Sequence, residues 1–139
     1  MRALDRGARC RGPRRAGRHL SSTNPANDAI RTVPVVFVAC AETGRAGFKK
    51  GEAATDKGDW YMYDTASAAH SLTLAAHALG LGTVHVGLFD SKKAQQIVGT
   101  PDNVRVVELI PMGHPAEQPH GPGRKELSEI VYRERYGQR

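Results

Sequence analysis

The chain has 139 residues, of which 40% are hydrophobic and 24% are charged, and it contains two cysteines. This length fits one small domain with a buried core. Cys10 and Cys40 stand in unlike contexts, which argues against a disulfide scaffold and favours a reducing, cytoplasmic setting. No uninterrupted apolar run is long enough for a membrane-spanning helix, so a membrane partner is not expected.

The net charge of +6 comes from the first 20 residues, which hold seven arginines and one acidic residue. Residues 1–31 show the apolar period of neither a strand nor a helix, so we expect a basic, disordered arm over 1–31 and a domain over 32–139. A plain solvated tail, a mis-started reading frame and an organelle transit peptide are further interpretations of the arm. Clustered arginine also attracts phosphate, but the arm has no aromatic residue on which a base could stack, which disfavours nucleic acid as the partner.

Three segments have the pattern of strands. Residues 33–40 form a nearly continuous β-branched and apolar run, which is typical of a strand covered on both faces, with Cys40 as a small buried residue at its end. Residues 83–89 and 104–112 have similar compositions. Residues 41–58 are polar and rich in glycine, and they predict a long surface loop that serves as a lid.

Residues 61–79 predict a helix that Gly80 ends, with Asp64 as its cap or in its first turn. Between Asp64 and Asp90 the sequence contains no Asp, Glu, Lys or Arg. A surface helix ordinarily carries a charged face, so this helix is expected to be enclosed on most sides. A domain of this size has difficulty enclosing it alone. We therefore expect a homodimer, with an alanine-rich monomer core as the alternative.

The remaining elements are short. Residues 91–98 predict a helix capped by Asp90 or Ser91, residues 99–103 predict a turn, and residues 124–132 predict a last short helix or tail. Helices alternate with strands, which indicates a mixed α and β fold.

Few motifs point to chemistry. His70 and His77 are seven residues apart, whereas a helical metal pair is spaced by four, so packed histidines are favoured and no metal site is predicted. No nucleophile or acid–base arrangement is evident, and no catalytic side chain is predicted. Arg124 and Lys125 are adjacent cations before a short helix and can hold a phosphate; a solvated helix start is the alternative.

Five segments together resemble the C-terminal part of the nitroreductase family of flavin enzymes, over residues 33–137. The order and spacing of the five make the resemblance specific. They are Trp60-x-x-x-Asp64, the stretch Leu74-Ala75-Ala76-x-Ala78-Leu79-Gly80-Leu81-Gly82-Thr83, Val86-Gly87-Leu88-Phe89-Asp90, Pro111-Met112-Gly113-His114-Pro115, and Arg124-Lys125-Glu126-Leu127-Ser128-Glu129-Ile130-Val131.

The resemblance implies an α+β sandwich that works as a homodimer, with the long helix in the dimer interface. It implies that FMN binds at this interface, that NAD(P)H reduces it, and that the flavin then reduces a nitroaromatic, a quinone or a related small-molecule acceptor. Val86, Gly87 and Leu88 match the segment against the flavin ring, and Arg124 and Lys125 match the pair that holds its phosphate. No acid–base side chain is required, because the cofactor carries the redox chemistry.

The start of the chain departs from the family. The family's Arg-Ser-x-Arg-type and Asn-x-Gln-Pro-Trp-like segments have only faint counterparts in residues 14–18 and 22–25. We therefore expect an N-terminally truncated nitroreductase-like sandwich that lacks about the first third of the family domain. The alternative to an active flavin enzyme is a non-catalytic domain that still dimerises but has lost cofactor binding through this truncation.

Overall fold

The structure is a computed structural model that describes residues 26–117 and 121–139. The expected basic arm therefore lies, up to residue 25, outside the described part. In chain order the elements are α2 (Asn27–Thr32), β1 (Val35–Glu42), β2 (Phe48–Lys49), β3 (Glu52–Ala53), α3 (Tyr61–Ala78), β4 (Gly82–Thr83), α4 (Ser91–Val98), β5 (Val104–Gly113) and α5 (Leu127–Ile130).

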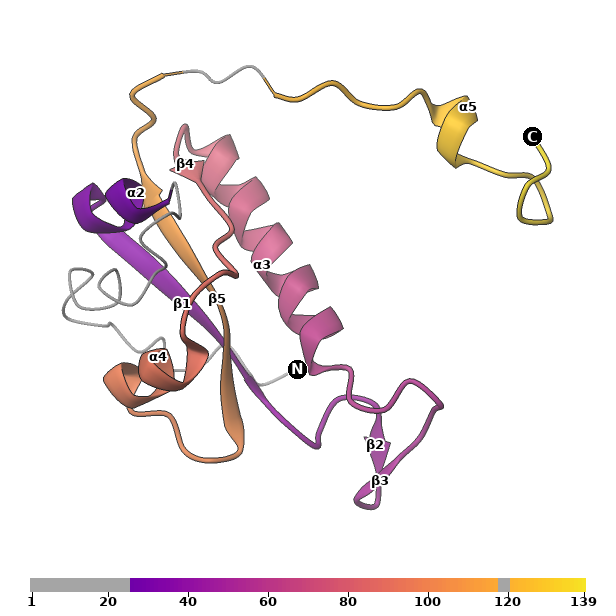
Figure 1. The fold of residues 1–139 in the computed structure, drawn as a ribbon, viewed down its shortest axis with the longest axis horizontal. Coiled ribbons are helices and arrows are strands. Elements are labelled where there is room, and N and C mark those ends of the chain that lie inside the picture. Colours follow the sequence, from indigo (N-terminus) through magenta and orange to yellow (C-terminus); the bar gives the residue numbers. More distant parts are fainter. Residues whose placement is uncertain (1–25, 118–120) are drawn as a thin grey trace.

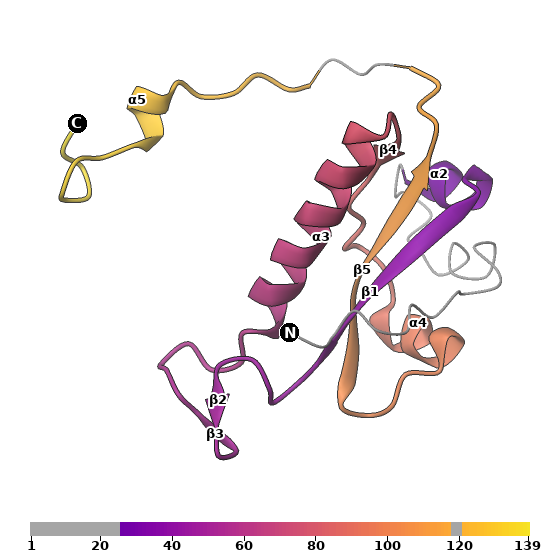
Figure 2. The same cartoon turned by 180° about the vertical axis from the view of Figure 1, so that it is seen from behind.

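A three-stranded antiparallel sheet in the order β1-β5-β4 forms the centre of the fold. β1 and β5 pair along their whole length, from Val35 opposite Met112 to Glu42 opposite Val104, with a bulge between Ala39 and Cys40. The long helix α3 covers one face of the sheet, and α2 and α4 cover the other (Figures 1 and 2). The expected α+β class is confirmed.

The most tightly packed core lies between the sheet and the α2–α4 layer, where the side chains are almost fully enclosed. Its members are Ala26, Ile30, Val36, Val86, Ala94, Val106 and Leu109. Ile30 on α2 is fully buried. The expectation of a disordered arm up to residue 31 is therefore wrong for residues 27–31, because α2 is too short to show a helical period in the sequence.

β1 is more exposed than its sequence suggests. Val35 and Phe37 are 39% and 41% exposed, and Cys40 is also exposed. Within the chain β1 is an edge strand, so part of its surface has no covering element. The expectations of a strand covered on both faces and of a buried Cys40 are therefore wrong for the single chain.

The helix expected over 61–79 is confirmed as α3. Asp64 lies in its first turn and Trp60 occupies the N-cap position, where Asp59 Oδ1 accepts a hydrogen bond from the Tyr61 amide. At the other end Gly80, at φ +75°, donates to the His77 carbonyl, and the Leu81 amide donates to the Ala76 carbonyl. This pair of bonds is a Schellman motif, which explains why Gly80 ends the helix.

Two further expectations need correction. The strand expected over 83–89 is only β4, followed by an isolated bridge between Val86 and Leu109. The loop expected over 41–58 begins with the end of β1 and contains the β2–β3 hairpin. By contrast, α4 and β5 follow the predicted segments, with Asp90 as the α4 cap. Among the described helices none is both long and apolar enough to cross a bilayer.

Candidate functional site

The segment Val86, Gly87 and Leu88 marks the point where the chain leaves the sheet. Val86 is buried and exchanges two backbone hydrogen bonds of 3.0 Å with Leu109. Leu88 is 67% exposed, and a Cβ built on Gly87 would have no neighbour within 4 Å. The backbone at Gly87 and Leu88 is therefore exposed next to the hydrogen-bonded pair Val86 and Leu109. A flat ligand has room beside Gly87.

His85, directly before this segment, is paired with Glu108 on β5. His85 Nδ1 lies 2.7 Å from Glu108 Oε2, and the Glu108 side chain is only 13% exposed. Because a largely buried carboxylate is costly without a partner, this pair stabilises the contact between the segment before Val86 and β5. No local pattern in the sequence indicates it, since 23 residues separate the two partners and no motif joins them.

Arg124 and Lys125 lie on the C-terminal segment, which runs away from the sheet toward α5 (Figure 1). Both side chains are exposed, and Arg124 Nη1 donates to the carbonyl of Pro122 at 3.3 Å. The structure thus does not bring this basic pair together with residues 86–88 within one chain.

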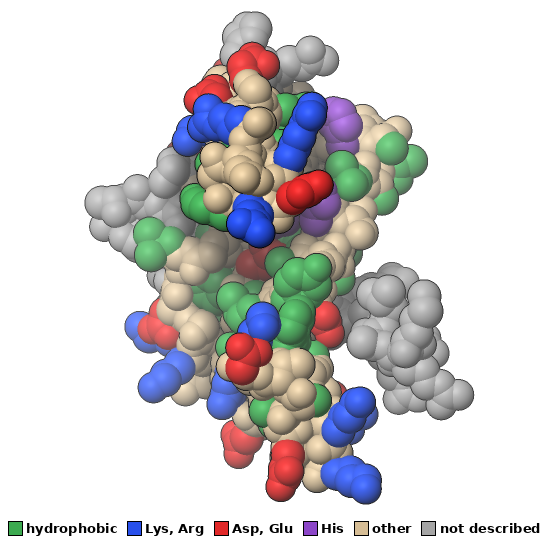
Figure 3. Space-filling view, turned by 90° about the vertical axis from the view of Figure 1, so that its right-hand side faces the viewer, with side chains coloured by type: hydrophobic (Ala, Val, Ile, Leu, Met, Phe, Trp, Pro, Cys, Tyr) green, Lys and Arg blue, Asp and Glu red, His purple; other side chains and the backbone are tan. Residues whose placement is uncertain are grey.

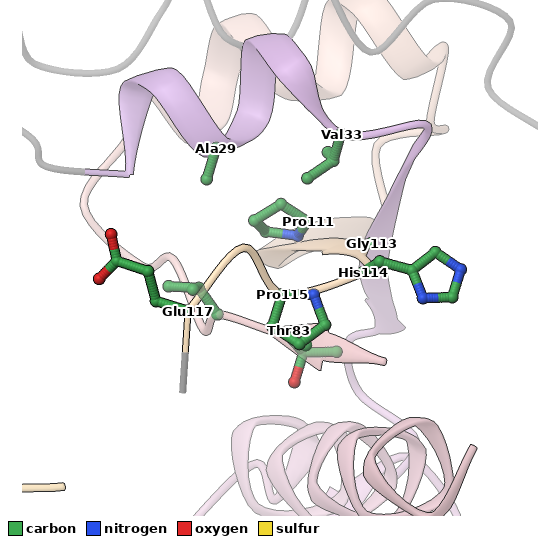
Figure 4. Close-up of a pocket in the computed structure, with 10 residues that line it drawn as sticks. Ala29, Val33, Thr83, Pro111, Gly113, His114, Pro115 and Glu117 are labelled. Atoms are coloured by element: carbon green, nitrogen blue, oxygen red, sulfur yellow. The ribbon is translucent and has the colours of Figure 1, made fainter. Parts of the chain in front are cut away.

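A shallow, mainly apolar cavity of about 260 Å³ lies between α2, β4 and the segment that follows β5 (Figure 4). Ala29 and Val33 point into it from one side and Pro115 from the other, while the ring of His114 points away. None of the five predicted cofactor-binding residues lines this cavity. Its full lining is Ala29, Val33, Gly82, Thr83, Val84, Pro111, Gly113, His114, Pro115 and Glu117.

The outer face of α3 carries almost no charge. The buried residues of α3 are Thr65, Ala69 and Ala76, which form one stripe toward the sheet, whereas Leu74 is 57% exposed. As expected for hydroxyls on such a helix, Thr65, Ser71 and Thr73 donate to carbonyls three or four residues earlier. Figure 3 shows charged side chains toward both the top and the bottom of this side of the molecule, with mostly uncharged side chains between them.

The β2–β3 hairpin is anchored to the start of α3. The Trp60 amide donates to the Ala46 carbonyl at 3.0 Å, and Trp60 Nε1 donates to Thr55 Oγ1 at 3.1 Å. Asp59 Oδ2 accepts from the Gly44 amide at 2.7 Å. The described residues contain no cluster of three or more His, Cys, Asp or Glu side chains suited to a metal ion.

Comparisons with known proteins agree with this arrangement. The model of the family described as "Nitroreductase family" matches residues 4–114. This match starts earlier than the expected residue 33, so it includes much of the expected arm, and it ends before Arg124 and Lys125.

Two relatives match about three quarters and about half of this chain. A Methanothermobacter thermautotrophicus protein, whose name assigns it to the NADH dehydrogenase/NAD(P)H nitroreductase class, is 26% identical over 112 residues, which are 78% of this chain and 52% of that protein. The NADPH-flavin oxidoreductase of Vibrio harveyi is 31% identical over 75 residues, which are 52% of this chain and 31% of that protein. The chain therefore spans about half of the first relative's length and about a third of the second's.

Solved structures share the fold. A nitroreductase family protein from Clostridium novyi NT superposes with a TM-score of 0.63 at 26% identity, covering 88% of this chain and 64% of the other. An iodotyrosine deiodinase, solved with FMN and 3-iodo-L-tyrosine bound, superposes with a TM-score of 0.60 at 19% identity, covering 78% of this chain and 50% of the other. The family match, the relatives and the shared fold agree, and the chain belongs to the nitroreductase family.

Proposed function

We propose that this chain is part of an FMN-dependent oxidoreductase that takes electrons from NAD(P)H and passes them to a nitroaromatic, a quinone or a related small acceptor. The observation that carries the proposal is the turn at residues 86–88, which is exposed at Gly87 and Leu88 and anchored by the buried Val86 through its bridge to Leu109 in a nitroreductase fold. The names of the two relatives support the reductant and the flavin, and the FMN bound to the iodotyrosine deiodinase supports the choice of flavin.

The residues present fit a flavin mononucleotide in two places. Open space beside Gly87 leaves room for the ring next to this turn. The exposed guanidinium of Arg124 and the ammonium of Lys125 are suited to a phosphate, to which they form charge-assisted hydrogen bonds. The bound flavin would supply the hydride chemistry, while these groups bind and orient it.

We propose that the working unit is a homodimer that pairs through the outer face of α3. An 18-residue helix with one acidic residue and no lysine or arginine is unusual on a free surface. Its exposed alanines allow a second helix to approach closely. A second copy would also supply the enclosure that the ring segment and the distant basic pair lack in one chain.

The cofactor claim is tested by titrating FMN into the full chain and following the flavin fluorescence. The double variant Arg124→Ala with Lys125→Ala is expected to bind FMN at least about a hundredfold more weakly, because each of the two lost phosphate contacts contributes about 1.5–3 kcal/mol. The control variant, Arg133→Ala with Arg135→Ala, makes the same charge change in the same C-terminal segment and should bind FMN like the wild type. Equal weakening in both variants, or no binding by the wild type, would contradict the proposed site.

The separation of the basic pair from residues 86–88 favours one alternative function, a nitroreductase-like domain that dimerises without a cofactor. This alternative predicts a folded dimer by light scattering whose melting temperature does not rise when FMN is added. A rise in melting temperature that depends on FMN concentration would exclude it.

A further inference from the structure

Glu108 is a largely buried carboxylate on β5 that pairs with one histidine. Its side chain is 13% exposed, and its Oε2 lies 2.7 Å from His85 Nδ1, whereas the His85 side chain is 48% exposed. An ionised carboxylate can only accept hydrogen bonds, so Nδ1 is the ring nitrogen that donates. Glu108 is therefore held by β5, and Glu108 in turn holds the half-exposed ring of His85 in place.

The pair lies across the antiparallel bridge that precedes the turn. Val86 and Leu109 exchange two backbone hydrogen bonds, and His85 and Glu108 are the residues directly before them in the sequence, so their side chains meet diagonally across this bridge. After Val86 the chain leaves the sheet, and Leu88 is 67% exposed. The turn at residues 86–88 is thus anchored through one backbone bridge and one charged hydrogen bond.

We propose that His85 is a positioning residue: its hydrogen bond to Glu108 anchors the turn at residues 86–88 and thereby sets the affinity of this turn for the flavin ring. The second half of this statement rests on the proposed function, whereas the first half concerns the chain alone. A hydrogen bond to a largely buried carboxylate is strong, because breaking it leaves the charge without a partner.

Two substitutions at one position separate the hydrogen bond from the bulk of the side chain. His85→Leu removes the donor. His85→Asn keeps one, because its amide nitrogen occupies about the place of Nδ1. His114→Leu removes an exposed histidine whose ring points away from the neighbouring cavity, and it serves as the control.

The first measurement is amide hydrogen exchange in the chain without ligand. His85→Leu is expected to speed exchange of the Val86 and Leu109 amides about tenfold, while the amides that donate hydrogen bonds between β1 and β5 keep their wild-type rates. His85→Asn and His114→Leu should exchange like the wild type at all of these positions. The second measurement is the FMN titration, in which His85→Leu is expected to raise Kd about tenfold and His85→Asn to restore it.

Unchanged exchange at Val86 and Leu109 in His85→Leu would overturn the proposal. Equal acceleration across the β1–β5 ladder would also overturn it, because the effect would then be general destabilisation. If exchange changes as expected but the wild type does not bind FMN, the anchoring stands and the proposed flavin function fails. If FMN binds equally to the wild type and His85→Leu, the link between the anchor and flavin affinity is wrong.

Discussion

Trp60 shows how single residues join the β2–β3 hairpin to α3. Its ring lies edge-on to Tyr63, with centroids 5.3 Å apart, and its Nε1 donates to Thr55. Gly47, at φ +77°, lies directly against this ring, and a Cβ built there would overlap Trp60 Cδ1. Gly47 is therefore required both by its backbone conformation and by the space that the indole occupies.

Gly47→Ala is expected to lower the free energy of unfolding by about 2–4 kcal/mol, because it combines a left-handed backbone with a steric overlap. The matched variant is Gly51→Ala, at φ +85° with open space around it, where only the backbone cost of about 1–2 kcal/mol applies. Urea unfolding of both variants measures the difference. Equal losses would show that Trp60 moves aside without cost.

At the scale of the element, α4 is specified almost entirely by its own ends. Asp90 has an extended backbone and accepts a hydrogen bond from the Lys93 amide at 3.0 Å, which satisfies a free donor of the first turn. Gly99 follows the last turn at φ +73°, the left-handed conformation that glycine adopts readily. Both signals are local, and both are visible in the sequence.

Asp90→Ala is expected to cost about 1 kcal/mol of stability, because it removes the N-cap acceptor. Ser91→Ala changes the neighbouring residue, the other cap candidate in the sequence, and should leave stability within about 0.5 kcal/mol of the wild type. Thermal unfolding followed by circular dichroism measures both. A larger loss from Ser91→Ala than from Asp90→Ala would contradict the assignment of the cap.

At the scale of the whole molecule, the distribution of charge is the dominant feature. Charged side chains lie toward both ends of the α3 side, with mostly uncharged ones between them (Figure 3). Large apolar side chains such as Met62, Tyr63 and Leu74 are more than half exposed on α3. Exposed apolar side chains on a helix with so few charges are typical of an interaction surface, which is why we propose this face as the dimer interface.

Leu74→Glu is expected to shift the chain from dimer to monomer, because it places a charge without a partner in the centre of the proposed interface. Ile97→Glu makes the same kind of change at a partly exposed position on α4 and should leave the dimer intact. Light scattering over a concentration series measures the mass of each variant. A wild-type monomer, or a Leu74→Glu dimer as stable as the wild type, would refute the interface.

Elements with local sequence signals can be predicted without the structure. The helix α3 with its Gly80 stop, the capped helix α4 and the apolar strand β5 all follow from periodicity, caps and composition within a few residues. The five segments of the resemblance were likewise enough to identify the family, because their order and spacing are properties of the linear sequence.

Features that depend on contacts between residues far apart in the chain could be identified only from the folded structure. Ile30 is buried because the sheet lies beneath it, and β4 is short because the chain turns away after the Val86–Leu109 bridge. His85 and Glu108 meet only through the register of that bridge, which no local pattern encodes. Burial and strand pairing depend on how the layers pack. The His85–Glu108 hydrogen bond, which we propose to anchor the turn at residues 86–88, could therefore be identified only from the folded chain.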